Sequence, residues 1–445
     1  MTDYIVAIDL GTSHITGIVG KKVEGGKFEI VATEVAASDS CILRGNVHNT
    51  KSTGDAVARI VDKLENHLAG DHIDRVYVGL GGQFLRTVEH VETKEIEDGA
   101  TVLDADMDAL RRQCEQYKPD DVSLDVIDVV SPVYYVDGNR DNNPEGVSCK
   151  RLEARYKLIV GPSSLRRNIN MSIKDHARKE VAGIIITPLA LADAVLSKQD
   201  KDLGCALIDF GAGVTSVTIY KDGILKNLSI IPFGGNLITR DITTVLNLTE
   251  DTAEKVKIEY GSAILKKDEE DKMIELDSVE SKISLNNLNV IIEGRVREII
   301  GNVIARINDA VDIKLLGAGI IIAGGVSELA GLDELLKDKS KKVRFSTVRA
   351  ELIQGSEDML GNPVYMQAIA LMLKGTKQCV YAPPVADVTE EVITTPEEPK
   401  PTSSGWGPFK KKKKLGQSKD DSDRVRDGGR NSGAGSLIGR LFDEE

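Results

Sequence analysis

The chain has 445 residues and a formal net charge of −13, so it is long enough for two or more domains with separate cores. The excess of acidic residues argues against nucleic acid as the main partner, because a phosphate backbone is bound by lysine and arginine in excess. Five scattered cysteines form no CxxC or Cys/His cluster, so we expect reduced thiols and neither a disulfide framework nor a structural zinc site.

The N-terminal residues carry no pattern for export. A strand pattern begins at Tyr4, without a basic region followed by an apolar one. No apolar run along the chain approaches the roughly 18 residues of a membrane-spanning helix. We therefore expect a cytoplasmic protein that is neither exported nor membrane-spanning.

The first predicted unit is a three-stranded meander followed by a helix. YIVAID runs into the turn DLGTSH at residues 9–14, and HITGIVGKK and FEIVATEVAAS follow around a Gly-Gly turn. Alternating apolar and β-branched residues favour strands, and apolar residues from near Ser52 repeat with helical spacing. The turn DLGTSH thus follows an apolar strand.

Residues 84–160 have the size of a small α+β insertion. VSLDVIDVVSPVYYV and CKRLEARYKLIV are strand-like, and LDADMDALRRQCEQY is a helical stretch whose start at Leu103 and Asp104 suits an N-cap. Taken alone, this segment is equally compatible with the substrate cap of a kinase.

A second glycine turn, DFGAGVTS at residues 209–216, repeats the first together with its flanks. CALIDF enters it, SVTIYKDG and ILKNLSIIPFG follow, and a helical stretch begins near Gly235. A single Asp-Gly turn is more often an ordinary hairpin. Two copies with matching flanks favour a duplicated phosphate-binding device.

The residue types in these turns suit a phosphate and its metal. Glycine lets the backbone approach a phosphate closely, and successive N–H groups form a concave anion site. An aspartate instead positions Mg²⁺ or its waters, which predicts Asp9 and Asp209 as metal-facing residues. The predicted nucleotide-binding residues of the turns and their flanks are Asp9, Gly11, Thr12, Ser13, His14, Gly211, Ala212, Gly213, Thr215, Gly234 and Gly235.

Two later segments complete the predicted folded part. RVREIIGNVIARI has one apolar helical stripe, which is more often core than an interface, and its opposite face carries Arg295, Arg297 and Arg306. GAGIIIAGGVSELAGLDELL predicts a buried strand, the pair Gly324-Gly325, and a helix with Ser327 as N-cap. The glycine pair alone is compatible with a tight strand-to-helix turn, but after two phosphate turns it indicates a nucleoside-binding turn.

The composition changes beyond residue 385. Residues 385–435 are rich in Pro, Glu, Ser, Gly and charged residues and predict a disordered linker. Its lysine run at 410–414, beside Trp406 and Phe409, suits either a solubilising block or contact with anionic lipid.

The last ten residues, 436–445, have one apolar helical face formed by Leu437, Ile438, Leu441 and Phe442. Burying four such side chains gains at most about 1.5–3 kcal/mol each, whereas ordering about eight residues costs about 1–2 kcal/mol apiece. One tip therefore binds a bilayer weakly, and stable attachment requires several tips acting together. A frayed helix without a role is the alternative.

Two Asp-Gly phosphate turns with a late Gly-Gly turn resemble the actin, Hsp70 and sugar-kinase superfamily. Within it, the chain resembles the FtsA family of bacterial cell-division proteins. The matching stretches are RGNVHN, NPEGVSCKRLEARYKLI, ITPLALADAVL, IPFGGNLITRDI and AEKVKIEYGSA, and they extend over residues 1–380. The resemblance implies an α/β, actin-like fold with a duplicated RNase H-like core, two lobes around a nucleotide cleft, and an inserted 1C subdomain.

The same resemblance implies roles for particular residues. Glu254 and Lys257 match the nucleotide-contacting pair of AExxK, although an exposed amphipathic helix with solvated charges is the alternative. Arg295 matches an arginine where the C-terminal peptide of the tubulin-like protein FtsZ docks, and Arg297 is its neighbour. The implied divisions are 1A (1–83 with 161–197 and 365–384), 1C (84–160), 2A (198–235 with 303–364), 2B (236–302), a linker (385–435) and a membrane-targeting tip (436–445).

Two functions are compatible with this pocket. The resemblance implies an adaptor that binds ATP and Mg²⁺, polymerises on the cytoplasmic face of the membrane at the division site, tethers FtsZ filaments and recruits further division proteins through 1C. Hydrolysis would be slow at most. The alternative is a sugar-kinase-type phosphotransferase, which requires a catalytic aspartate that we cannot assign. The linker and its apolar tip favour the adaptor.

Overall fold

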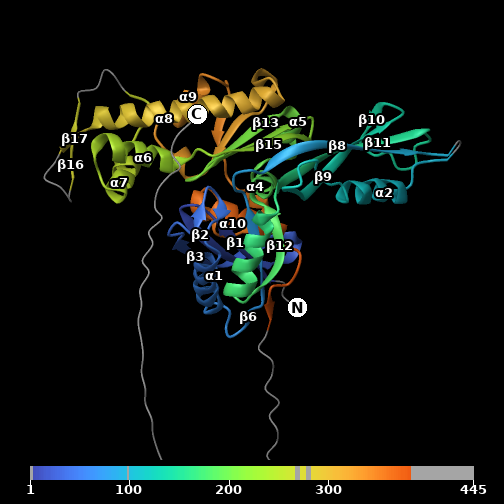
Figure 1. The fold of residues 1–445 in the computed structure, drawn as a ribbon, viewed down its shortest axis with the longest axis horizontal. Helices are drawn as coiled ribbons and strands as arrows, with labels where there is room; N and C mark the ends of the chain where they lie inside the picture. Colours follow the sequence, from blue (N-terminus) through green and yellow to red (C-terminus); the bar gives the residue numbers. More distant parts are fainter. Residues whose placement is uncertain (1–3, 98–99, 266–270, 277–281, 382–445) are drawn as a thin grey trace, which may run out of the picture. The chain divides into compact units, whose positions relative to one another are not determined.

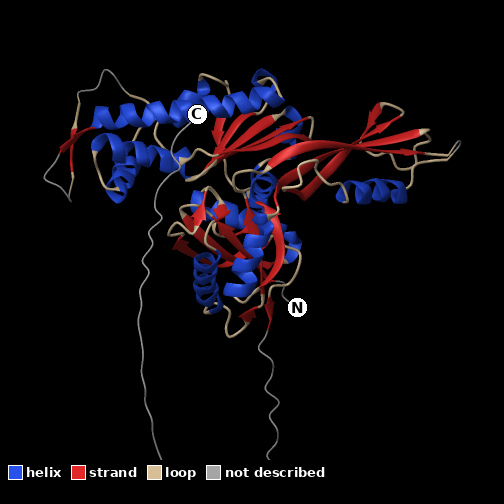
Figure 2. Ribbon diagram, in the orientation of Figure 1, coloured by secondary structure: helices blue, strands red, loops and turns tan. Residues whose placement is uncertain are grey.

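A computed structural model describes residues 4–97, 100–265, 271–276 and 282–381, within a compact unit that spans Met1–Val385. Two larger sheets organise this unit (Figures 1 and 2). One has six strands in the order β12-β7-β1-β2-β3-β20, and the other has nine in the order β10-β9-β11-β8-β15-β14-β13-β18-β19. We call the part built on the six-stranded sheet lobe 1 and the part built on β15-β14-β13-β18-β19 lobe 2. The predicted two-lobed α/β architecture is confirmed.

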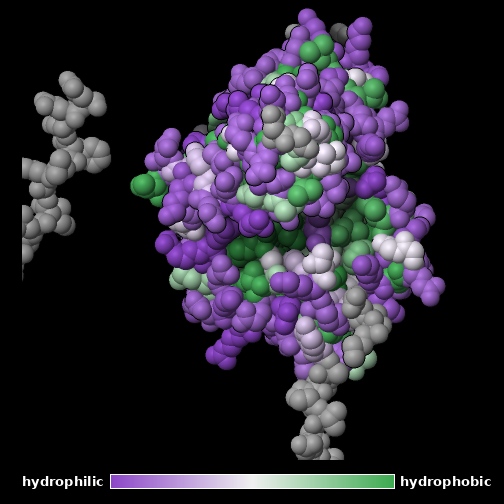
Figure 3. Space-filling model, turned by 90° about the vertical axis from the view of Figure 1, so that its right-hand side faces the viewer, coloured by the Kyte–Doolittle hydropathy of each residue, from purple (hydrophilic) through white to green (hydrophobic). Residues whose placement is uncertain are grey.

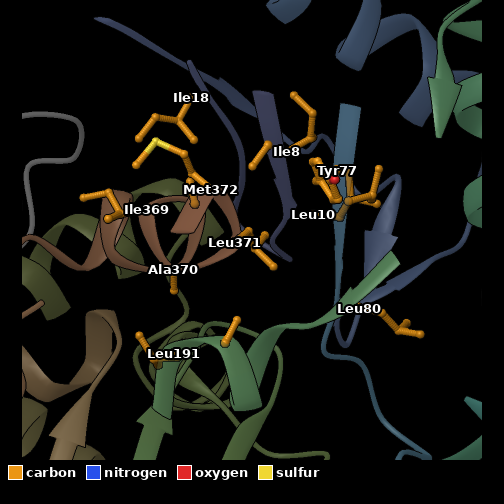
Figure 4. Close-up of a cluster of buried hydrophobic side chains, with 14 of the residues drawn as sticks. Ile8, Leu10, Ile18, Tyr77, Leu80, Leu191, Ile369, Ala370, Leu371 and Met372 are labelled. Carbon is orange, nitrogen blue, oxygen red and sulfur yellow. The ribbon is translucent and has the colours of Figure 1, made fainter. Parts of the chain in front are cut away.

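Lobe 1 contains the first predicted meander, whose three strands are confirmed. Its strands are β1 (Tyr4–Leu10), β2 (His14–Lys22), β3 (Phe28–Ala37), β7 (Arg75–Leu80), β12 (Glu180–Ile186) and β20 (Ile353–Gln354). Its principal helices are α1 (Thr50–Glu65), α4 (Thr187–Val195) and α10 (Pro363–Lys374). The apolar side chains of α10 pack against those of β1, β2 and α4, which brings the end of the described chain into the core that its beginning forms (Figure 4).

Lobe 2 repeats the meander, again as predicted. Its strands are β13 (Cys205–Phe210), β14 (Thr215–Lys221), β15 (Ile224–Ile231), β18 (Gly319–Ala323) and β19 (Val343–Phe345). The long helix α8 (Leu285–Ala310) packs against α6 (Gly235–Leu246) and α7 (Glu250–Tyr260). Its predicted apolar stripe is core: Val296, Ile299, Ile300, Val303 and Ile307 are buried. The helices α5 (Lys198–Leu203) and α9 (Leu332–Lys337) and the hairpin β16 (Met273–Glu275)–β17 (Lys282–Ser284) complete this part.

The segment predicted as an insertion has a buried core of its own. It contains β8 (Arg86–Glu95), α2 (Asp104–Glu115), β9 (Leu124–Val136), β10 (Asn139–Asp141) and β11 (Arg151–Pro162). The helix starts where predicted, and the Asp106 carboxylate accepts a hydrogen bond of 2.8 Å from the Leu103 N–H. Pairing of Arg86 with Ser229 joins these strands to lobe 2, which the sequence pattern did not predict.

Short elements connect these layers. They are β4 (Ile42–Leu43), β5 (Asn46–Val47), β6 (His72–Ile73), β21 (Val380–Tyr381), α3 (Ser164–Asn170) and η2 (Met171–His176). Single-turn helices cover Glu24–Gly26, Ile313–Leu315, Gly325–Glu328, Ala350–Leu352 and Glu357–Met359. Among the described residues, no helix combines the length and apolarity that crossing a membrane requires. The face seen in Figure 3 is mostly hydrophilic, with hydrophobic side chains gathered in a hollow at its middle.

Candidate functional site

A cleft of about 590 Å³ lies between the two lobes and is lined by residues from both. This volume falls within the range of small-molecule sites, roughly 300–1,000 Å³. Lobe 1 contributes the turn after β1, the start of α4 and the start of α10. Lobe 2 contributes the turn after β13, the starts of α6 and of the single-turn helix η4 (Gly325–Glu328), and one face of α7. The two glycine turns predicted from the sequence therefore meet in one cavity.

The two glycine turns have the same geometry. Asp9 pairs in register with Thr16 of β2, and Asp209 pairs with Ser216 of β14. A Cβ atom on Gly11 would lie 2.5 Å from the His14 carbonyl oxygen, and one on Gly211 would lie 2.9 Å from that of Val214. Only glycine closes such a tight turn, so each strand delivers its aspartate to the cleft next to the backbone of a glycine turn.

The two aspartates are buried carboxyl groups close enough to repel one another. Each is 7% exposed. Burial, reinforced by the charge of Asp209, raises the pKa of Asp9 to about 7, and burial raises the pKa of Asp209 to about 6 although a hydrogen bond from Gln367 opposes the rise. Oδ1 of Asp209 is buried and has no hydrogen-bond partner among the described residues. A bound cation would stabilise both charges, and Mg²⁺ is commonly held by one or two carboxylates together with phosphate oxygens.

The third glycine site lies beside Asp209. Gly324 has a φ of +84°, and a Cβ atom there would lie 2.5 Å from Asp209 Oδ1 and close to the Phe210 carbonyl. The prediction that Ser327 caps a helix here is wrong, because its hydroxyl donates to the Gly324 carbonyl at 2.6 Å inside the single turn Gly325–Glu328. The glycine is thus needed to pack strand β18 against the aspartate. Gly325 has open space around it and faces the cleft.

The pair Glu254 and Lys257 lies on α7 at the wall of the cleft. Lys257 is 9% exposed, and its Nζ donates to Glu254 Oε2 at 2.6 Å and to Thr239 Oγ1 at 2.9 Å. The Thr239 hydroxyl also bonds Glu254. A freely solvated lysine on an amphipathic helix would not be buried in this way, so the alternative reading fails for Lys257.

Most predicted nucleotide-binding residues line the cleft, and two do not. Thr215 is fully buried and its hydroxyl donates to the Phe233 carbonyl at 2.8 Å, while Gly234 packs against the backbone of the second turn. His14 lines the cleft, and burial lowers its pKa. The predicted residues that line it are Asp9, Gly11, Thr12, Ser13, His14, Asp209, Gly211, Ala212, Gly213, Gly235, Glu254, Lys257, Gly324 and Gly325.

Sequence reasoning missed several polar or glycine positions in the cleft, among them Ser216, Thr187, Gln367, Gly79 and Gly81. Some signals were available. Gly79 and Gly81 stand in VGLGG directly after an apolar run, and Gln367 is a lone polar residue within the apolar stretch VYMQAIALML. Each of these patterns is also common in ordinary turns and helices, so only the tertiary structure places the three residues in the cleft.

The two arginines predicted to bind a peptide lie on α8 and make ion pairs within the protein. Arg295 makes a bidentate pair with Asp241 of α6, with N–O distances of 2.6 and 3.0 Å, and a further pair with Glu298. Arg297 pairs with Glu293 at 2.7 Å. The linker 385–435, the lysine run and the tip residues Leu437, Ile438, Leu441 and Phe442 lie outside the described residues.

Comparison with known proteins relates the chain to one family. Residues 206–370 match the sequence model described as "Cell division protein FtsA". A protein of that name from Porphyromonas gingivalis strain W83 is 31% identical over 384 residues, covering 85% of this chain and 80% of the relative. Another from Neisseria meningitidis serogroup B strain MC58 is 32% identical over 379 residues, covering 83% and 89%. One from Bacillus subtilis strain 168 is 27% identical over 383 residues.

A solved structure supports the fold independently. A chain of the PilM–PilN type IV pilus biogenesis complex superposes with a TM-score of 0.59. The match covers 83% of this chain and 97% of the other at 15% identity. At this identity the similarity concerns the fold alone.

Proposed function

Because this chain belongs to the FtsA family of cell division proteins and has an actin-like fold, we propose that it binds Mg·ATP and tethers FtsZ filaments to the membrane. In this proposal it polymerises on the cytoplasmic face of the membrane at the division site. The inserted segment 84–160 would serve as subdomain 1C and recruit further division proteins. The other predicted subdomain boundaries are part of the same proposal.

The observation that supports Mg·ATP is the pair of buried carboxylates between two glycine turns. Gly11 and Gly211 leave room for phosphate oxygens, and Asp9 and Asp209 would hold Mg²⁺ directly or through water. When bound, Mg²⁺ neutralises phosphate charge. Lys257 adds a positive charge on the lobe 2 wall. A slow ATPase is the most that we propose.

A second cavity of about 700 Å³ weighs against the phosphotransferase. It shares Thr12, Ala212 and Gly213 with the first, so the two cavities meet at the glycine turns. A sugar kinase would hold its acceptor there, beside a catalytic aspartate. Among the described residues that line this cavity, Glu250 is the one carboxylate, and Arg44 and Arg240 supply opposite charge.

For FtsZ, we propose that its C-terminal peptide docks against α8 beside Arg295. Arg295 pairs with Asp241 and Glu298, so a glutamate in its place would be repelled by both carboxylates. A loss of peptide binding after this charge reversal could therefore come from a disturbed α8 instead of a lost peptide contact. A sharper design compares Arg295→Ala with Asp241→Ala. If Arg295 binds the peptide, freeing it by Asp241→Ala should preserve or raise peptide affinity in fluorescence anisotropy, whereas Arg295→Ala should lower it. Equal losses in both variants would assign Arg295 to packing of α8 on α6.

Liposome sedimentation tests the whole proposal. The full chain with ATP, Mg²⁺ and anionic liposomes should co-sediment and carry FtsZ with it, and the variant without residues 436–445 should stay in the supernatant while still binding ATP. Leu441→Glu should approach the truncation, because one charge removes much of a narrow apolar face. Equal sedimentation of the full chain and the truncation would contradict the membrane role. Loss of ATP binding in both would contradict the nucleotide role instead.

A further inference from the structure

The two cleft aspartates differ in what holds them. Gln367 Nε2 donates a hydrogen bond to Asp209 Oδ2 at 2.6 Å, which is the one hydrogen bond that Asp209 side-chain oxygens receive among the described residues. Its other oxygen, Oδ1, is buried and has no partner among the described residues, and Asp209 itself lines the cleft. Neither side-chain oxygen of Asp9 receives a hydrogen bond from a described residue. One carboxylate is therefore oriented by an amide, and the other is not.

The amide reaches Asp209 from the opposite lobe. Gln367 lies on α10, between the buried residues Met366 and Ala368 of the lobe 1 core. Asp209 lies on β13 of the nine-stranded sheet. Because both helix and strand are embedded in packed cores, neither end of the bond rotates freely. The bond thus joins two rigid elements across the cleft.

The contacts around Asp209 assign different tasks to its two oxygens. Oδ2 is occupied by Gln367 at 2.6 Å. On the other side, the backbone of Gly324 packs close to Oδ1, where any Cβ would lie 2.5 Å away, and no donor from a described residue reaches this oxygen. A carboxylate oxygen that is buried and unpaired in a residue that lines the cleft is suited to a cation or to a water in its shell.

We propose that Gln367 is a positioning residue for the metal–nucleotide site, orienting Asp209 so that Oδ1 is presented to the cation. This inference rests on the proposed binding of Mg·ATP. Groups that orient a metal-facing ligand typically change metal affinity about 10–100-fold when removed. Since the amide and the carboxylate belong to different lobes, the same bond also links the two lobes across the cleft.

The test uses Gln367→Met, which keeps the length of the side chain and removes the amide, in the full chain. The matched control is Gln378→Met, because Gln378 also bonds the backbone of lobe 1 through its amide, at Tyr4 and Val380, but does not line the cleft. Isothermal titration calorimetry with ATP, over a series of Mg²⁺ concentrations and in EDTA, measures the cation dependence. Thermal unfolding reports folding of each variant.

We expect Gln367→Met to raise the Mg²⁺ concentration for half-maximal ATP binding about 10–100-fold, with ATP binding in EDTA unchanged. Gln367→Asn, whose amide is too short to reach Asp209, should shift it in the same direction. Gln378→Met should leave the Mg²⁺ dependence as in the unaltered chain. An unchanged dependence in both folded Gln367 variants, or an equal loss with and without Mg²⁺, would overturn the positioning role. If the unaltered chain itself shows no Mg²⁺-dependent ATP binding, the proposed function fails and the inference fails with it.

Discussion

The hairpin of lobe 1 and the hairpin of lobe 2 place their aspartates in equivalent positions but in different environments. Asp9 stands opposite Thr16 beside strand β7, and Asp209 stands opposite Ser216 beside strand β18. Both are equally buried. Burial raises the pKa of Asp9 to about 7, and the charge of Asp209 adds to the rise. Burial raises the pKa of Asp209 only to about 6, because the hydrogen bond from Gln367 stabilises its charged form.

The surroundings of the two hairpins diverge further along the chain. In lobe 2, β15 leads directly into α6 at the cleft, and α7 adds Lys257. In lobe 1, a connection that contains the short strands β4 and β5 separates β3 from α1, and the Asn49 side chain caps that helix by accepting from the Ser52 N–H at 3.0 Å. Duplication thus supplies a symmetric pair of glycine turns with buried aspartates, while the added groups of lobe 2 make the cleft asymmetric.

The largest effect is expected from filling the glycine site of lobe 2. Gly324→Val places a branched side chain at a φ of +84° and against Asp209, so it should abolish ATP binding and cost at least the roughly 1–3 kcal/mol of a strained backbone. Chemical unfolding and calorimetry measure the two effects. Gly325→Ala is the control, since open space surrounds it. Equal behaviour of the two variants would contradict the close packing inferred at Gly324.

The next test removes the charge from either aspartate. Asp9→Asn and Asp209→Asn should each lower Mg·ATP affinity by tenfold or more while raising the stability of the nucleotide-free protein, because a buried unpaired charge is removed. Asp55→Asn, at an exposed carboxylate paired with Lys51, is the control. A lower Mg·ATP affinity in calorimetry together with a higher melting temperature in thermal unfolding would indicate a binding site, whereas a loss of both would indicate a structural pair. A loss of stability in both variants would contradict this assignment.

The pH dependence of stability follows from the same two groups. The folded pKa values of about 7 and about 6 exceed the value of 3.8 for an ordinary aspartate, so the folded state binds more protons in between. The contribution of these two groups to the free energy of unfolding of the nucleotide-free protein should therefore fall as pH rises from about 4 to 7. Urea titrations of the unaltered chain and of the double Asn variant measure it. The same slope in both proteins would show that other groups dominate.

A smaller effect is expected from Lys257, the lysine that α7 adds to the lobe 2 side of the cleft. Lys257→Met should weaken ATP binding by about 1.5–3 kcal/mol, the range for a hydrogen bond to a charged group, if Lys257 contacts the nucleotide. Glu254→Gln keeps the shape of its partner and should have less effect, because the Glu254 side chain is 43% exposed. Calorimetry of both variants ranks them. Unchanged affinity in Lys257→Met would leave this lysine a structural role only.

Much of the frame was predictable because it is encoded locally. The six strands of the two meanders follow from apolar alternation, and the start of α6 follows from its glycine. Ser327 does not cap a helix and Thr215 does not line the cleft, and both differences have a related reason. A hydroxyl near a glycine turn suits a cap or a ligand equally well, and only packing shows that each donates to a nearby carbonyl.

The sequence by itself determined the duplication, the two aspartates and the family, since each depends on short patterns of adjacent residues. The tertiary structure alone decided which groups surround those aspartates. The bond from Gln367 to Asp209 joins residues 158 positions apart, and the pair of Arg295 with Asp241 joins residues 54 apart. Such contacts form because α10 packs on β1, β2 and α4, and because α8 packs on α6. The periodicity of a helix predicts which of its faces is buried, but it does not predict which element covers that face.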